Sequence, residues 1–230
     1  MDYNERKKLI IGVCTRGNDL YYRLVDWFIP YVNQPKMPTE ILLKSSPYSA
    51  AVGQGMIMEA AVAKGADYLL MLDSDIGPTD GCLEQLMSHD KDIILAPIWF
   101  FDEAKKDIHI NVILPHSASR LHTKGKGLER IVSGSFGLML VKVSALKKFK
   151  DAGESFVEWS PFIDVAYKKA GLSDNIFFAK ADKLGIEAWV DWDIDGITHY
   201  RLVELCDETV KNIRESYEPA NATISEMAEA

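Results

Sequence analysis

The sequence predicts a single α/β domain in which a mostly parallel mixed sheet is flanked by helices. Two observations carry this prediction. Short apolar runs alternate with segments of helical periodicity along residues 9–96, and the run YLLML at residues 68–72 is apolar at every position. Strand–helix alternation is typical of a parallel sheet, and a fully apolar strand is covered on both faces. The 230 residues, 47% hydrophobic and 26% charged, suffice for one sizeable core.

The first half of the chain alternates strand and helix. Its apolar runs predict strands at residues 9–13, 40–44, 68–72 and 93–96. The segments between them predict helices at residues 19–32, 50–64 and 80–88. Gly65 is a natural stop for the second helix, and Thr79 is a candidate cap for the third. We expect the sheet to be parallel and doubly wound in this half.

The second half is less regular. Apolar stretches predict further strands at residues 108–114, 138–141 and 187–191. The first of these alternates between apolar and polar residues, as a half-exposed strand does. Ser144 and Ser173 are candidate caps for two helices, the second of which stops at Gly185. We assign residues 1–205 to one domain and residues 206–230 to a C-terminal helix with a frayed acidic tail.

Composition narrows the class of protein. The net charge of −8 argues against a broad nucleic-acid-binding surface, which needs a surplus of Lys and Arg. The three cysteines, Cys14, Cys82 and Cys206, lack zinc-ligand spacing and are expected to be free thiols in a reducing compartment. The N-terminal apolar run is too short for a signal peptide, and no stretch approaches the ~20 apolar residues of a membrane span. We therefore expect a cytoplasmic protein with no transmembrane segment.

The most informative segment is YLLMLDSDIGP at residues 68–78, where the apolar strand runs directly into Asp73, Ser74 and Asp75. Ligands of open α/β sheets bind beyond the carboxyl ends of the strands. Residues i and i+2 of an extended chain point the same way, so both carboxylates are expected to face one spot. Two such carboxylates repel each other unless a cation lies between them, which favours a hard divalent metal. The plain alternative is a pair of solvated loop aspartates.

Residues 60–96, which contain this segment, resemble the nucleotide-sugar-binding half of family 2-like glycosyltransferases of the GT-A fold. The resemblance continues through SGSFGLMLVKVSALKKF at residues 133–149 and through SDNIFFAKADKLGIEAWVDWDIDGITHY at residues 173–200. It therefore covers most of residues 8–200, and the order and spacing of the motifs are more specific than any single one. It implies a Rossmann-like GT-A domain that holds Mn²⁺ or Mg²⁺ against the diphosphate of a nucleotide-sugar donor. The sugar would pass to an acceptor hydroxyl.

The resemblance also implies roles for single residues. The metal ligands would be Asp73, Asp75 and His199, the histidine of GITHY. Imidazole beside carboxylates suits Mn²⁺ or a similar ion better than Ca²⁺. The nucleotide-sugar contacts that the resemblance implies are Thr15, Arg16, Asp73, Ser74, Asp75, Gly134 and Ser135. In this assignment Thr15 and Arg16 form the nucleotide-contacting turn, and Gly134 and Ser135 lie beside the donor sugar.

One departure from the family concerns the general base. The family has Glu-Asp at the start of an acidic helix, whereas this chain has Asp174 and Asn175. Asn175 takes the position of the base, and an amide cannot accept a proton at working pH. Three interpretations stay open: Asp174 is the base, or the enzyme retains configuration and needs no base there, or the protein binds a donor without efficient transfer. A metal-dependent phosphatase or nucleotidyltransferase is a further alternative for the aspartate pair.

Other expectations are weaker. Gln54 and Gly55 stand where relatives carry Arg-Asn, which removes a predicted diphosphate contact. Serines follow the second strand where the family offers an acidic residue to the base: Ser45, Ser46 and Ser49. Four aromatic residues are candidates for stacking on sugars: Trp99, Phe100, Trp159 and Phe162. Three aspartates before His199 are expected to be mostly solvated or to lie behind the metal ligands: Asp191, Asp193 and Asp195.

Overall fold

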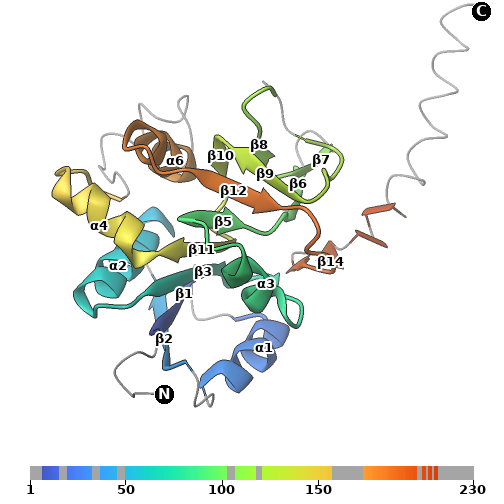
Figure 1. The fold of residues 1–230 in the computed structure, drawn as a ribbon. Helices are drawn as coiled ribbons and strands as arrows, with labels where there is room; N and C mark the ends of the chain where they lie inside the picture. Colours follow the sequence, from blue (N-terminus) through green and yellow to red (C-terminus); the bar gives the residue numbers. More distant parts are fainter. Residues whose placement is uncertain are drawn as a thin grey trace, which may run out of the picture.

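The computed structural model describes residues 7–15, 20–32, 37–45, 50–102, 107–117, 121–156, 173–200, 204–205, 207–208 and 210–211. These residues form one α/β domain, in which a seven-stranded sheet lies between two layers of helices (Figure 1). Helices α1 (Tyr22–Val32) and α3 (Cys82–Ser88) cover one face of the sheet. Helices α2 (Ala50–Ala63), α4 (Val143–Asp151) and α6 (Ser173–Lys183) cover the other face.

The strand order of the large sheet is β2-β1-β3-β11-β5-β12-β9. The strands are β1 (Leu9–Thr15), β2 (Thr39–Ser45), β3 (Tyr68–Asp73), β5 (Ile93–Leu95), β9 (Leu128–Ile131), β11 (Leu138–Lys142) and β12 (Ala188–Asp191). β1 pairs in parallel with β2 and β3, and β12 pairs in parallel with β5. β11 is antiparallel to both β3 and β5, so these two strands run the same way. The predicted fold class, a mostly parallel mixed sheet flanked by helices, is confirmed.

The four strands of the first half, β1, β2, β3 and β5, run the same way, as expected. β11 from the second half lies between β3 and β5, a position that the sequence analysis did not predict. Periodicity along the sequence identifies a strand, whereas its neighbours are decided by pairing between segments far apart in the chain.

Three small sheets lie outside the large one. β4 (Ile76–Gly77) pairs with β13 (Thr198–Tyr200), which also pairs with β14 (Glu204–Leu205). β6 (Trp99–Asp102) pairs with β7 (Asp107–Ile110), and β8 (Val112–Ile113) pairs with β10 (Ser133–Gly134). β4 follows β3 along the chain, β6 follows β5, and β13 follows β12, so these ribbons continue from the carboxyl ends of the parallel strands.

Several predicted elements differ from the observed ones. Residues 108–114 are not one half-exposed strand, because the chain breaks at Asn111 into β7 and β8. Thr79 does not cap α3: its hydroxyl donates to the Asp195 carbonyl (3.0 Å), and the residue before the helix is Gly81. Helix α4 begins at Val143, so Ser144 lies within the first turn. Residues 204–205, just before the expected C-terminal helix, form β14, and the described residues that follow, 207–208 and 210–211, are helical.

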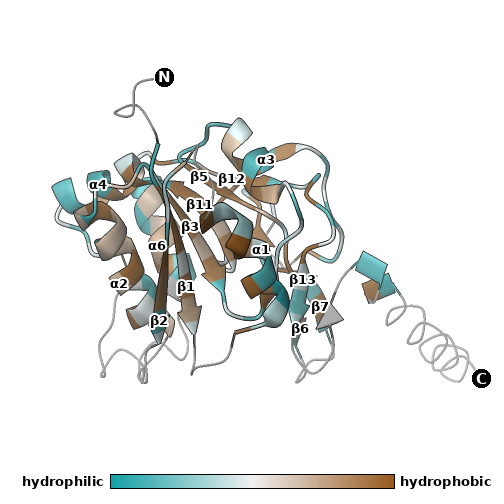
Figure 2. Cartoon of the chain, turned by 90° about the horizontal axis from the view of Figure 1, so that it is seen from below, coloured by the Kyte–Doolittle hydropathy of each residue, from teal (hydrophilic) through white to brown (hydrophobic). Residues whose placement is uncertain are grey.

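The core consists of two apolar layers, one on each face of the sheet. Side chains that alternate along β1 illustrate this: Ile10 packs toward α2, α4 and α6, whereas Leu9 and Ile11 pack toward α1 and α3. Figure 2 shows the apolar strands in the interior of the domain. At Gly12 the backbone approaches helix α2 so closely that a Cβ atom would collide with Cγ2 of Ile57.

Cys14 and Cys82 are buried and form no disulfide within the described part of the chain, whereas Cys206 lies outside it. Burial raises the pKa of the Cys82 thiol to about 12, which keeps it protonated and unreactive. Among the described helices, none combines the length and the apolar character needed to cross a bilayer.

The close approach at Gly12 generates a stability prediction. Gly12→Ala should lower the free energy of unfolding by ~1–3 kcal/mol, because the added methyl overpacks against Ile57. Ile57→Ala alone should cost ~2–5 kcal/mol as a cavity mutation. The double variant should lose less than the sum of the two, because the new methyl partly fills the cavity. Urea unfolding of all four proteins measures this coupling, and strict additivity would contradict it.

Candidate functional site

The candidate site lies where β3 ends. Asp73 is the last residue of this strand, and the chain turns at residues 74–75 before it enters β4. The expectation that Asp73 and Asp75 lie on one extended segment is therefore wrong, because the i, i+2 rule holds only along a strand. That both carboxylates face one spot stays a prediction.

Two backbone hydrogen bonds hold this turn. The Tyr21 N–H donates to the Ser74 carbonyl at 2.8 Å, and the Tyr200 N–H donates to the Asp75 carbonyl at 2.7 Å. Tyr21 stands at the start of α1, and Tyr200 ends β13. The rings of the two tyrosines also stack on each other, with centroids 4.9 Å apart. The turn is thus clamped between the start of the first helix and the last strands of the fold.

The clamp brings His199 to Asp75. In the antiparallel pairing of β13 with β4, His199 stands opposite Ile76, the neighbour of Asp75. The imidazole is only 2% exposed, and its Nε2 lies 3.3 Å from Oδ2 of Asp75. The other ring nitrogen, Nδ1, lies 2.9 Å from the Trp99 carbonyl oxygen. The ring of Phe100 packs edge-on against the imidazole, with centroids 4.6 Å apart.

The contact with Trp99 fixes the chemistry of His199. A carbonyl oxygen only accepts, so Nδ1 must carry a proton to make this bond. Nε2 then has two options. It carries a second proton and forms an ion pair with Asp75, or it presents a lone pair to the carboxylate. In the second case two acceptors face each other, and a cation between them satisfies both. Histidines that bind metals commonly donate their other ring N–H to a backbone carbonyl in this way.

Two of the three predicted metal ligands lie close enough to share a divalent ion. Asp75 and His199 are in contact, and a carboxylate with an imidazole suits Mn²⁺. Within the described part of the chain, however, no three His, Cys, Asp or Glu side chains group as they do around a metal ion. Mg²⁺-type sites are often built from one or two protein ligands, with water and substrate phosphates filling the rest. The residues present fit that kind of site and do not form a closed protein cage.

Asp73 lies close to the segment that leads into β11. Its backbone N–H donates to the Gly137 carbonyl at 3.1 Å. A Cβ atom on Gly137 would lie 3.2 Å from Oδ2 of Asp73, 2.9 Å from Ile98 and 3.5 Å from the Ser135 hydroxyl. The absence of a side chain at Gly137 thus lets Asp73 and Ser135 approach the same point. Ser135 is buried, and Gly134 is buried in β10.

The start of α6 is tied to the same segment. Oδ1 of Asn175 accepts a hydrogen bond from the Ser133 hydroxyl at 2.5 Å, and Ser133 begins β10. Asp174, the predicted catalytic residue, is half-buried in the first turn of α6. The chain from Ser133 through Ser135 to Gly137 therefore connects the helix start with Asp73.

The predicted nucleotide contacts are only partly described. Thr15 is buried at the end of β1 and stands opposite Ser45 in the parallel pairing with β2. Arg16, Ser46 and Ser49 lie outside the described residues. Gln54 is buried in the second turn of α2, and its Oε1 receives no hydrogen bond in the described part of the chain. Burying an acceptor without a hydrogen bond costs folding free energy, and no contact in the described part of the chain explains the position of this oxygen.

Two of the four aromatic residues predicted to stack on sugars lie within the described residues. Trp99 is buried, and its indole N–H donates to Asp207 at 2.6 Å, so it is a core residue and not an open platform for a sugar. Phe100 is partly buried against His199 and His109. Trp159 and Phe162 lie outside the described residues.

Of the three aspartates before His199, Asp191 is the exception to the expectation of solvation. It is 2% exposed, and its Oδ2 accepts hydrogen bonds from Gln85 (2.8 Å) and contacts Nε2 of His89 (2.7 Å). The one feature of the sequence that indicated a buried Asp191 is its position at the end of an apolar strand. Asp193 and Asp195 are exposed; the first accepts the Gly127 N–H, and the second pairs with Lys124.

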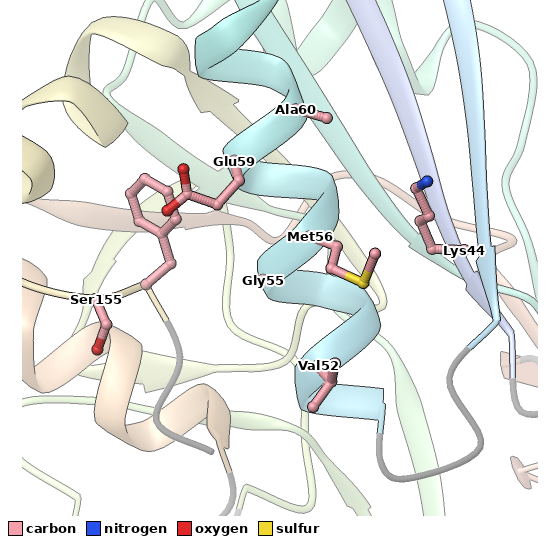
Figure 3. Close-up of a pocket in the computed structure, with 8 residues that line it drawn as sticks. Lys44, Val52, Gly55, Met56, Glu59, Ala60 and Ser155 are labelled. Atoms are coloured by element: carbon pink, nitrogen blue, oxygen red, sulfur yellow. The ribbon is translucent and has the colours of Figure 1, made fainter. Parts of the chain in front are cut away.

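A cavity of about 510 Å³ lies elsewhere, on the outer side of α2. Its lining includes Lys44 of β2, Met56 and Glu59 of α2, and Phe156 (Figure 3). None of the predicted site residues lines it. The chemistry at the Asp73–Asp75 turn and this cavity are therefore separate features.

The fold is similar to that of a protein of known structure. Comparison with protein-family models gave no match, and neither did comparison with curated proteins. The structure of A197 from STIV matches with a TM-score of 0.57 at 12% identity, over 84% of this chain and 86% of that one. At this identity the likeness shows a common fold and nothing about activity.

Two enzymes of known structure match less well. The mannose-1-phosphate geranyltransferase of Thermus thermophilus has a TM-score of 0.42 at 12% identity, over 80% of this chain and 73% of that one. The nucleoside-diphosphate-sugar pyrophosphorylase of Vibrio cholerae has a TM-score of 0.40 at 11% identity, over 80% of this chain and 72% of that one. Likeness at this level carries no argument about this chain.

The two contacts of His199 generate a prediction that separates fold from metal binding. In His199→Asn, the amide nitrogen can still donate to the Trp99 carbonyl, but nothing remains at the position of Nε2. The variant should keep a cooperative thermal transition and lose Mn²⁺ affinity by roughly 10-fold or more. His199→Ala should also destabilise by ~1–3 kcal/mol, because it leaves the buried carbonyl without a donor.

The matched control is His122→Asn. His122 also places Nδ1 on a backbone carbonyl, that of Ile108 (3.0 Å), but it lies away from the turn. Its variant should bind Mn²⁺ as the wild type does, measured by calorimetry or by the signal of free Mn²⁺. Unchanged Mn²⁺ affinity in His199→Asn would return His199 to a structural role.

Proposed function

We propose that the protein is a metal-dependent glycosyltransferase, which moves a sugar from a nucleoside-diphosphate donor to an acceptor hydroxyl. The observation that carries the proposal is the contact of Asp75 with His199 at the carboxyl edge of the sheet. His199 is oriented by the Trp99 carbonyl so that Nε2 faces the carboxylate. The order of motifs along residues 60–200, which resembles family 2-like glycosyltransferases, supports the same function.

A Mn²⁺ or Mg²⁺ ion would be held by Asp75 and His199, which are in contact, and by Asp73 as the third predicted ligand. When bound, the ion supplies a Lewis acid that neutralises charge on the leaving diphosphate. The protein's own contribution is to keep the turn rigid through the Tyr21 and Tyr200 backbone bonds. Such preorganisation means that little reorganisation is needed during the reaction.

The donor sugar would lie along the segment from Gly134 to Gly137, beside Asp73. The lack of a side chain at Gly137 leaves the Asp73 carboxylate and the Ser135 hydroxyl near one point. The Asp73 carboxylate can accept hydrogen bonds from sugar hydroxyls, and the Ser135 hydroxyl can donate to a phosphate oxygen or accept from a sugar hydroxyl. Thr15, Arg16 and Ser74 complete the proposed nucleotide contacts.

Asp174 is the proposed general base for the acceptor hydroxyl. It stands in the first turn of α6, where the helix dipole favours the ionised carboxylate. Asn175, at the position of the family's base, has its carbonyl oxygen bonded to Ser133 and cannot take up a proton.

The hydrogen bond between Ser133 and Asn175 favours a second function, a nucleotide-sugar-binding module without efficient transfer. This bond holds the Asn175 side chain in a structural role. The two functions differ in turnover and not in donor binding. A nucleotidyltransferase would instead release pyrophosphate or a sugar phosphate, so the products of the same assay identify it.

Donor binding should depend on metal. A panel of nucleotide sugars, titrated by calorimetry in Mn²⁺ and then in excess chelator, should show one donor that binds only with the metal. Asp75→Asn should weaken that binding by roughly 10-fold or more, because it removes a ligand. Asp151→Asn, at an exposed position at the end of α4, is the control and should bind as the wild type does. Equal donor affinity in chelator and in Mn²⁺ would contradict the assignment of a metal site to Asp75 and His199.

Asp174→Asn should reduce turnover by about 10²–10⁴-fold, as expected for loss of a general base, with donor affinity unchanged. Asp182→Asn, an exposed aspartate on the same helix, should leave both quantities unchanged. The assay needs a competent acceptor and a separate donor-binding measurement.

Normal turnover in Asp174→Asn would favour a retaining mechanism. Transfer by Asn175→Asp, when the wild type binds donor but transfers to no acceptor, would establish the binding-module function.

A further inference from the structure

Strand β2 is the exposed border of the large sheet. It stands at one end of the strand order, and among the described residues it pairs with β1 alone (Figures 1 and 2). It has seven residues, TEILLKS, with no proline inside it. The opposite border strand, β9, has only four. Proteins usually shorten, bend or cover such borders, because an open strand offers its backbone groups to another chain.

The hydrogen-bonding direction along β2 can be assigned. The Leu9 N–H donates to the Pro38 carbonyl at 2.9 Å, in a parallel pairing that sets Leu9 opposite Thr39. Backbone groups alternate sides along a strand, so Glu40, Leu42 and Lys44 direct theirs toward β1. The outward groups then belong to Thr39, Ile41, Leu43 and Ser45.

The sequence of β2 is complementary to itself when read antiparallel. If a second copy pairs about Leu42, Glu40 faces Lys44 of the second copy, and Lys44 faces its Glu40. Ile41 faces Leu43 in the same arrangement, and these are the residues whose backbone groups point outward. The register therefore matches charge, apolar character and hydrogen-bonding direction together.

The two charged residues of β2, Glu40 and Lys44, differ in their ion pairs within one chain. Glu40 already contacts two lysines, Lys64 (2.7 Å) and Lys8 (3.8 Å). Lys44 has no carboxylate within ion-pair distance in the described part of the chain. Pairing about Leu42 would supply it with one, the Glu40 of the other copy.

Apolar side chains are exposed beside the same border. Leu43 of β2 is 50% exposed, and Met56 of α2 is 49% exposed. Met56 extends from α2 toward the strand that carries Lys44 (Figure 3). A two-fold axis at Leu42 would place both α2 helices on one face of the combined sheet, with Met56 of each at the junction.

We infer that β2 is a self-association surface, through which two copies of this chain form one continuous antiparallel sheet centred on Leu42. The occupant is a second copy because the strand complements itself in charge. The inference is independent of the proposed catalytic function.

Sedimentation equilibrium of the full chain tests the interface. The wild type should be a dimer. Lys44→Glu should weaken it by roughly 10–100-fold, because the symmetry creates two like-charge pairs. Adding Glu40→Lys to Lys44→Glu should restore the dimer. Lys126→Glu, the same change at an exposed position in a loop, should leave the dimer intact.

Leu43→Pro tests the backbone pairing. It removes an outward N–H and leaves the pairing with β1 intact, so the variant should fold, as circular dichroism would show, and be monomeric. Glu40→Lys removes the Glu40–Lys64 ion pair, which could unfold the double variant. In that case Leu43→Pro still tests whether β2 forms the dimer interface. A wild type that stays monomeric at every concentration overturns the inference, and so does a dimer that resists either Lys44→Glu or Leu43→Pro.

Discussion

A short antiparallel pairing between β13 and β4 joins the last strands of the fold to the turn that follows β3. Because His199 stands opposite Ile76 in this pairing, its imidazole reaches Asp75 across the junction. The Tyr200 N–H adds a bond to the Asp75 carbonyl, and the Tyr21 N–H secures Ser74. The candidate site therefore depends on backbone hydrogen bonds between segments far apart in the sequence, and its side chains are oriented by these bonds.

The sequence predicted the parts of this site but not their arrangement. The prediction that residues 68–72 form a strand that runs into Asp73 is confirmed. The turn at 74–75 was not predicted, because Asp and Ser occur in turns but do not by themselves show where a strand ends. Likewise, periodicity identified β11 as a strand but could not place it between β3 and β5. Burial of Asp191 depended on Gln85 and His89, which lie on another element.

The contacts of the two aspartates differ. Asp75 and His199 present oxygen and nitrogen atoms suited to a divalent ion. Asp73 lies near Gly137 and Ser135, on the segment that connects through Ser133 to Asn175 and the start of α6. We propose that the diphosphate binds at Asp75 and His199 and the sugar beside Asp73. Because the Asn175 side chain accepts a hydrogen bond from Ser133 and cannot take up a proton, proton transfer in this proposal depends on Asp174.

The most direct measurement is anomalous diffraction from crystals grown with Mn²⁺ and a nucleoside diphosphate. We expect a Mn²⁺ peak bonded to Nε2 of His199 and to the Asp75 carboxylate, with diphosphate oxygens completing the coordination. Nδ1 of His199 should remain on the Trp99 carbonyl. A nucleotide bound at the turn with no metal peak there, or a peak that contacts neither Asp75 nor His199, would contradict it.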